Sequence, residues 1–222
     1  GFSRWANSFD RTIKDIFAVQ SEIANAVASA LVEEVAADGG QAPNIEAPTS
    51  GGTHNVAAFD AYLRGKALYS LHADEKTYRE ALAQFDAAID EDPKYAAAYS
   101  ARARSLTSIA NQYATADQFI ALYGEAEAAA RKAVSLAPRY ADAQSTLGVV
   151  LFQGKLDFRG ARHPFEVSRR LGPGDASVLA RFATFCSAVG RFNEATEAMS
   201  RALKLDPLNP AMYNSAGFVQ YS

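Results

Sequence analysis

The feature that most constrains this chain is a helix ending that recurs four times along it. In the last copy, Ala195, Met199 and Ala202 follow one another at helical steps, and Pro207 comes after them. Proline has no N–H group and disfavours helix in the residue before it, so each copy ends a helix. The earlier copies have small or apolar residues and a proline at the same offsets: Ala161, Phe165, Ser168 and Pro173; Ala126, Ala130, Ala133 and Pro138; Ala81, Phe85, Ala88 and Pro93.

The spacing of these prolines leaves room for two helices in each repeat. From Pro207 backwards, the steps to Pro173, Pro138 and Pro93 are 34, 35 and 45 residues. Two antiparallel helices approach closely only where the side chains at their crossing are small. The first small residue of each copy provides that crossing, at Ala81, Ala126, Ala161 and Ala195.

A period near 34 residues with this second helix resembles the tetratricopeptide repeat, whose pattern is W-x2-L-G-x2-Y, then A-x3-F, then P. The third repeat also has Leu147 and Gly148 as the family pattern requires, whereas the second has Tyr99 but Arg102 and Ala103. The resemblance implies an all-α tetratricopeptide repeat solenoid, in which antiparallel helix pairs stack in a right-handed superhelix.

The repeats differ in length. Gly65 is the candidate for the crossing glycine of the first repeat, and we expect the turn of that repeat around residues 72–76. In the second repeat Ile109 to Tyr123 forms an insertion that we expect to prolong both helices. Residues 210–221 begin a fifth repeat.

The chain is predicted to consist of three segments. Residues 1–38 contain one long amphipathic helix from Asp10 to Asp38, in which apolar residues recur at three- and four-residue steps. Residues 39–53 contain glycine, proline and serine without periodicity and predict a flexible linker. The repeat array then covers residues 54–222, with Thr53 or Asn55 capping its first helix.

Residues 1–31, GFSRWANSFDRTIKDIFAVQSEIANAVASAL, resemble the end of the TolB-like domain that precedes such repeats in many bacterial regulators. In that family a strand with a tryptophan is followed by an acidic-basic pair and an Asp-hydrophobic-Phe-x-x-Gln stretch. The matching residues here are Trp5, Asp10, Arg11, Asp15, Ile16, Phe17 and Gln20. The resemblance implies that the strands of that domain precede Gly1.

The two resemblances together imply the C-terminal part of a bacterial signalling protein. The output domain of such proteins is a class III adenylate or guanylate cyclase, which we favour slightly, or a winged-helix DNA-binding domain. Related proteins place the repeats on either side of the inner membrane, so cytoplasm and periplasm both stay open. Because the chain begins without methionine and ends at Ser222 inside a first helix, we expect a fragment.

Composition excludes some classes of partner. Lys and Arg together number 22 against 25 Asp and Glu, and they are dispersed, which does not favour nucleic acid. No apolar run approaches the roughly 18 residues of a membrane span. The lone Cys186 occupies an apolar first-helix position and is expected to pack in the core.

No residue pattern indicates catalysis, a metal site or a cofactor. His54, His72 and His163 are far apart, without a second ligand at a helical step, and we expect His72 and His163 in turns or at helix starts. The sequence has no phosphate-binding loop and no nucleophile with a partner histidine. The acidic residues 90–92 are expected to form a solvated helix end.

The remaining candidate site is the concave groove that first helices form in such arrays. Its predicted lining mixes aromatic and polar residues with only two cations, unlike the clamp of several Lys, Arg and Asn residues in the chaperone-binding subgroup. The predicted lining residues are Tyr62, Lys66, Tyr69, Ser100, Arg104, Ser145, Val149, Phe152, Thr184, Asn214 and Phe218.

The sequence therefore predicts a non-catalytic protein-protein interaction module. Its ligand would be a protein or peptide, or the upstream domains of its own chain. The alternatives are the sensor arm of a winged-helix transcriptional regulator and a self-association scaffold that forms homodimers.

Overall fold

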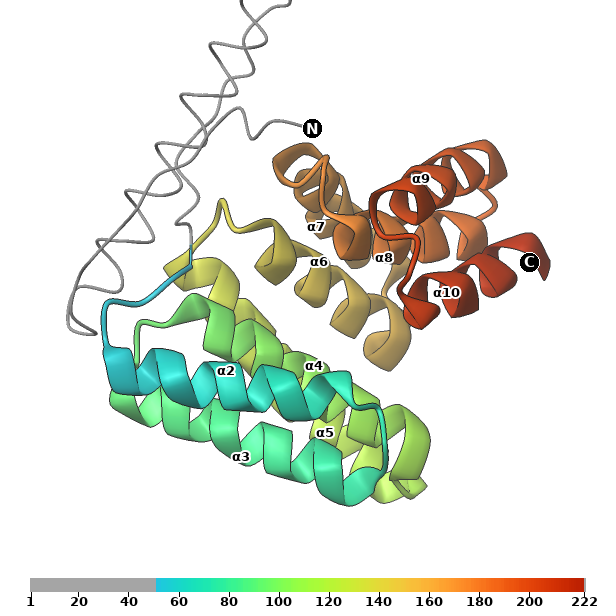
Figure 1. Cartoon of the computed structure of the whole chain (residues 1–222). Coiled ribbons are helices and arrows are strands. Elements are labelled where there is room, and N and C mark those ends of the chain that lie inside the picture. The colour runs from blue at the N-terminus through green and yellow to red at the C-terminus, as the bar shows by residue number, and fades with distance from the viewer. Residues whose placement is uncertain (1–50, 222) are drawn as a thin grey trace, which may run out of the picture. The chain divides into compact units, whose positions relative to one another are not determined.

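The computed structural model describes residues 51–221, and every regular element in that range is helical (Figure 1). The predicted amphipathic helix, the TolB-like stretch and residues 39–50 of the predicted linker lie outside the described residues. The described helices follow one another as antiparallel pairs, and neighbouring pairs pack side by side. The prediction of an all-α repeat solenoid is confirmed.

Among residues 51–221, the array consists of four helix pairs and one further helix. The bounds are α2 (Val56–Ser70) with α3 (Glu75–Glu91), α4 (Ala96–Tyr113) with α5 (Ala116–Leu136), α6 (Ala141–Val149) with α7 (Phe158–Leu171), α8 (Ala176–Ala188) with α9 (Phe192–Leu205), and α10 (Pro210–Tyr221). A π-helical turn, η2 (Val150–Gly154), continues α6. The helix α10 lies where the sequence predicts the first helix of a fifth repeat.

The helix ends follow the local sequence. Each second helix ends two residues before its proline: α3, α5, α7 and α9 end at residues 91, 136, 171 and 205. At the other end, Asn55 caps α2 by accepting hydrogen bonds from the backbone N–H groups of Ala57 (2.9 Å) and Ala58 (3.1 Å). The prolines therefore act as predicted, and Asn55 rather than Thr53 provides the cap.

Small residues lie at the predicted crossings. Ala81, Ala126, Ala161 and Ala195 are all fully buried. A Cβ atom at Gly65 would lie 2.6 Å from the ring of Phe85, and one at Gly148 would lie 2.9 Å from the ring of Phe165. Both glycines therefore let a second-helix phenylalanine pack directly against the backbone of the first helix.

The insertion in the second repeat lengthens both of its helices, as predicted. The helices α4 and α5 have 18 and 21 residues. Their turn lies at Ala114 and Thr115, where the side chains of Thr115 and Gln118 form a capping box. The extended part carries Tyr123, which is buried against the π-helical turn at Gly154.

Of the two predictions for histidines in turns or at helix starts, one is wrong and one is confirmed. His163 lies in the middle of α7 and not in a turn or at a helix start, because α7 continues through Pro164. Pro164 has no N–H group to complete the helical ladder, yet it is buried and tolerated there. His72 does lie in the turn after α2, with a positive φ of 47°.

The residues before α2 contact the array. The backbone N–H of Ala97 donates to the carbonyl of Gly51 (3.0 Å), and the Thr53 hydroxyl donates to Asp92. Gly51 also packs against the ring of Tyr140. Residues 51–53, which the sequence assigned to the linker, are thus held against the first turn of α4 and the residues just before α4 and α6. Of the acidic residues 90–92, the first two are exposed, and Asp92 accepts the hydrogen bond from Thr53.

Candidate functional site

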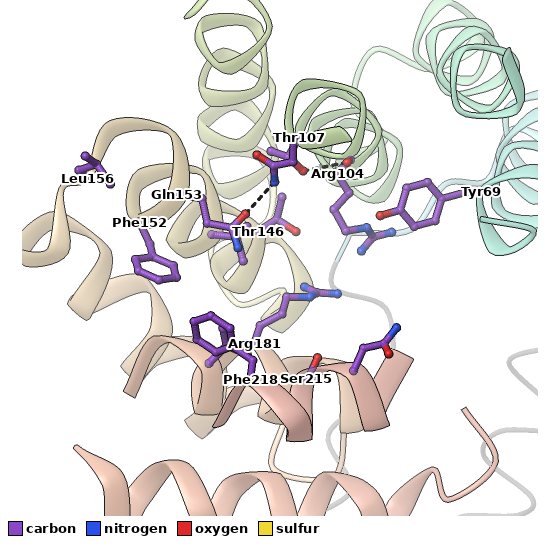
Figure 2. Close-up of a pocket in the computed structure, with 14 residues that line it drawn as sticks. Tyr69, Arg104, Thr107, Thr146, Phe152, Gln153, Leu156, Arg181, Ser215 and Phe218 are labelled. Carbon is purple, nitrogen blue, oxygen red and sulfur yellow. Dashed lines mark hydrogen bonds between the residues drawn. The ribbon is translucent and has the colours of Figure 1, made fainter. Parts of the chain in front are cut away.

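A groove of about 600 Å³ runs over the first helices of successive repeats (Figure 2). The turn after η2 supplies one lining residue, and the others come from α2, α4, α6, η2, α8 and α10. The lining consists of Tyr69, Arg104, Thr107, Asn111, Thr146, Val149, Phe152, Gln153, Leu156, Arg181, Thr184, Asn214, Ser215 and Phe218.

The structure brings most of the predicted groove residues to this lining. They are Tyr69, Arg104, Val149, Phe152, Thr184, Asn214 and Phe218. Ser100 and Ser145 are instead fully buried beneath it. Tyr62 and Lys66 lie on α2 outside the lining, where the Lys66 ammonium is 5.8 Å from the centre of the Tyr62 ring.

An ion cluster that the sequence did not predict lies under the groove. Asp142 on α6 accepts hydrogen bonds from Arg104 on α4 (Nη1 to Oδ1, 2.5 Å) and from Arg181 on α8 (Nη1 and Nη2 to Oδ1, 3.0 Å each). Ser100 donates to the other carboxylate oxygen at 2.6 Å. Arg181 also donates to Ser145. One carboxylate therefore connects three consecutive first helices.

The charges of this cluster are strongly coupled. Burial alone would raise the pKa of Asp142, but Arg104 and Arg181, with the Ser100 hydrogen bond, hold that pKa well below its usual range. Burial acts to lower the pKa of Arg104, and Asp142 more than offsets it, so this pKa is raised. Two positive charges thus face one negative charge, and the cluster carries a net positive charge.

Aromatic side chains flank the cluster on the α2 side. The Arg104 guanidinium carbon is 6.0 Å from the centre of the Tyr69 ring, within the range of a cation-π interaction. The Tyr69 hydroxyl is hydrogen-bonded to Ser108 at 3.0 Å. Burial raises the pKa of Tyr62, an effect that Arg104 partly offsets. This end of the groove is therefore cationic with an aromatic edge.

The opposite end of the groove is apolar. Phe152 packs against Phe158 and Phe185, with ring centres 5.6 and 5.7 Å apart. Leu156 and Phe218 are 68% and 50% exposed, so both present apolar surface to solvent. In Figure 2 the side chains of Phe152 and Leu156 lie on the far side of Arg181 from Tyr69.

Side-chain amides lie between these ends. Asn111 donates to Gln153 at 3.2 Å, and the Tyr123 hydroxyl donates to Asn111 at 2.9 Å. A Cβ atom at Gly154 would overlap the Tyr123 ring, so the π-helical turn and the buried tyrosine fit only with glycine there. Such turns occur frequently at functional sites. Here the turn places Gln153 on the lining.

Sequence reasoning missed part of this site because it considered only one or two turns of each first helix. Arg181 lies one turn before the predicted Thr184, and Asp142 lies one turn before the predicted Ser145. A search of the preceding helical turns for an acidic partner of Arg104 would have found Asp142. A search for a second basic partner of Asp142 would then have found Arg181. Besides Arg181, the lining residues missed were Thr107, Asn111, Thr146, Gln153, Leu156 and Ser215.

Residues 51–221 offer little to other types of site. No group of three or more His, Cys, Asp or Glu residues there could hold a metal ion. Within the same range, the helices are too short or too polar to cross a bilayer. Cys186 is fully buried, and burial raises the pKa of its thiol to about 12.

Comparison with known proteins gives structural likeness only. No protein-family model matches the sequence, and neither does any curated protein. A thermophilic tetratricopeptide repeat protein from Thermus thermophilus superposes with a TM-score of 0.50 at 17% identity, covering 74% of this chain and all of its own. This likeness shows that the chain has the fold of a tetratricopeptide repeat solenoid.

Two further solved structures are more distant. MamA gives a TM-score of 0.47 at 17% identity, covering 90% of this chain and 97% of its own. YrrB, described as a tetratricopeptide repeat protein with an unusual peptide-binding site, gives a TM-score of 0.45 at 20% identity. The match covers 73% of this chain and 75% of YrrB.

Proposed function

We propose that this array is a non-catalytic module that binds a peptide segment of a protein partner in the groove over its first helices. The observation that carries the proposal is the groove itself, which combines a cationic end, bridging amides and an apolar end on one scaffold. Recognition sites pair apolar surface with a few placed polar groups in this way. Because the stacked helix pairs of a solenoid form one extended surface, the groove suits an extended segment.

Photo-crosslinking in the native cell tests this proposal. A photoreactive amino acid replaces Leu156 in the groove or, as a matched control, Ile120 on α5, since the two side chains are 68% and 72% exposed. We expect discrete cross-linked partners from position 156 only, and we expect Arg104→Glu to abolish them. Equal products from both positions, or products that persist with Arg104→Glu, would contradict groove binding.

The signalling setting is the finer part of the proposal. The TolB-like resemblance of residues 1–31 supports a role as the C-terminal regulatory part of a bacterial signalling protein. Its output domain is then a class III cyclase or, as the alternative, a winged helix, and the groove ligand is a segment of that domain. The coding sequence upstream of Gly1 tests this setting, because a different type of domain there would overturn it.

Self-association is a second candidate function with its own structural support. Gly217 on α10 occupies the position of Gly65 and Gly148, yet nothing lies within 4 Å of a Cβ atom built there. Tyr213 and Phe218 on the same helix are 56% and 50% exposed. Sedimentation velocity tests this function: a concentration-dependent dimer that Gly217→Leu abolishes supports it, and a monomer at all concentrations contradicts it.

A further inference from the structure

We infer that the groove selects peptide segments in which an acidic side chain contacts Arg104 and Arg181 while a bulky apolar side chain contacts Phe152, Leu156 and Phe218. This inference rests on the proposed function and names the chemistry of its ligand. It follows from the charge of the lining, from the way the arginines are held, and from the separation of the two ends.

The charge of the lining favours an anion. Arg104 and Arg181 reach the groove with side chains that are 21% and 22% exposed, whereas Asp142 beneath them is only 12% exposed. None of the fourteen described lining residues is acidic. Each guanidinium has five N–H donors, more than one shared carboxylate oxygen can accept. The groove therefore presents an excess of positive charge and of donors.

The arginines are held in place before any ligand binds. Asp142 fixes both guanidinium groups, while Ser100 fixes the carboxylate and Ser145 contacts Arg181. The Tyr69 ring borders Arg104 as well. Ordering long side chains in advance reduces the entropy lost on binding. Asp142 is thus a positioning residue, which aims two cations at the groove without itself lining it.

The apolar end selects a different group. Phe152, Leu156 and Phe218 come from η2, the turn after it and α10, so three elements each contribute an apolar side chain to the groove. Figure 2 shows Phe152 and Leu156 well separated from Arg104. A ligand that uses both ends needs two distinct side chains. A groove of about 600 Å³ is large enough for two such side chains and the backbone between them.

Selection from a random peptide library tests this inference. A phage-displayed library of random 12-residue peptides is selected on the purified chain, on Arg181→Gln and on Leu156→Asn. Leu156 has a positive φ of 52°, a conformation in which asparagine is enriched, so asparagine suits this position. The matched control is Arg64→Gln, which removes an arginine from α2 that is 61% exposed and paired with Asp60. Circular dichroism and thermal melting confirm that each variant is folded.

We expect the unaltered chain and Arg64→Gln to enrich an acidic residue at a fixed distance from a bulky apolar one. Arg181→Gln should lose only the acidic preference, and Leu156→Asn should weaken only the apolar one. In a synthetic copy of the selected peptide, replacing Glu by Gln or Asp by Asn should reduce affinity roughly tenfold or more, as for a lost charged hydrogen bond. Amidating the peptide C-terminus should not change affinity, because the ligand group is a side chain.

The experiment distinguishes failure of the inference from failure of the proposed function. A consensus without an acidic residue that still depends on Leu156 would overturn the inference and leave peptide binding in the groove intact. Loss of affinity on amidation would assign the cationic end to a terminal carboxylate instead, and would also overturn it. Enrichment that no groove variant alters, or no enrichment at all, would count against both the inference and the proposed function.

Discussion

At the residue scale, the glycines of the first helices show how closely this fold depends on the absence of a side chain. A Cβ atom added at Gly148 would lie 2.9 Å from the ring of Phe165, whereas one added at the equivalent Gly217 would have no neighbour within 4 Å. The same substitution should therefore destabilise the fold at Gly148 but not at Gly217. The comparison separates packing from the intrinsic helix preference of the new residue.

Gly148→Leu should destabilise the fold by about 1–3 kcal/mol, because a core that is already filled must rearrange to hold the added atoms. Gly217→Leu, its matched control in α10, should be neutral or slightly stabilising. Urea unfolding followed by circular dichroism measures both values. Similar effects at the two positions would contradict the close packing of Phe165 against Gly148.

The buried cluster predicts a strong effect of removing one charge. Asp142→Asn should destabilise the fold by about 3–5 kcal/mol, because Arg104 and Arg181 lose their carboxylate in a largely buried site. Arg64→Gln, which removes one partner of the exposed pair with Asp60, should cost less than about 1 kcal/mol. Chemical denaturation at neutral pH measures the difference. Equal costs would mean that Asp142 is not the central partner of the cluster.

The pH dependence of the same variant follows from the lowered pKa of Asp142. A carboxyl whose folded-state pKa lies below its unfolded value stabilises the fold fully above the unfolded value, near 3.8. That contribution is lost as the pH falls towards the folded value. The stability gap between the unaltered chain and Asp142→Asn should stay constant from about pH 7 to pH 5 and narrow below about pH 4. A gap independent of pH down to pH 3 would contradict this.

Cys186 reports on the opening of α8. It is fully buried, its pKa is raised to about 12 by burial, and it is the single cysteine of the chain. At pH 8 its thiol should therefore react with a disulfide reagent only when α8 opens or the chain unfolds. Absorbance of the released thiolate measures the rate with and without urea. Rapid, complete reaction in native buffer would show that the position is open to solvent.

At the element scale, the helices and their order were predictable, because prolines, capping residues and small crossing residues are local signals. The π-helical turn was not, since it depends on Tyr123 from another helix pressing against Gly154. The His163 prediction was wrong for a related reason: burial of Pro164 overrides its usual effect on a helix. The Asp142 cluster requires three helices to converge, and a pattern read along one helix does not contain that information.

The helix α10 should be the least protected described helix. Its neighbours α8 and α9 cover one side, and Tyr213 and Phe218 remain half exposed. By contrast, residues 142–148 of α6 are all buried. Hydrogen exchange should therefore be fastest in α10 and much slower in α6, as sparse packing lowers the free energy of local opening. Equal protection of the two helices would indicate a further contact on α10.

At the scale of the whole molecule, a repeat array is held together by contacts between neighbours only. The Asp142 cluster adds a connection of longer range, because α4 and α8 both depend on one residue of α6. Exchange measured under increasing urea should show α4, α6 and α8 opening at a common free energy. In Asp142→Asn the three should open separately, whereas Arg64→Gln should leave them together. Separate opening in the unaltered chain would contradict this link.

That shared carboxylate also limits how the chain can change its length over time. Solenoids commonly gain or lose whole repeats by duplication or excision of a gene segment. Here, excision of residues 141–175 would join α4 and α8 as neighbours and bring Arg104 and Arg181 together without Asp142, and duplication of the same segment would give the two arginines different carboxylates. In proteins that evolve from this one, we therefore expect the number of repeats in the middle of the array to stay the same. The number of repeats at either end can change.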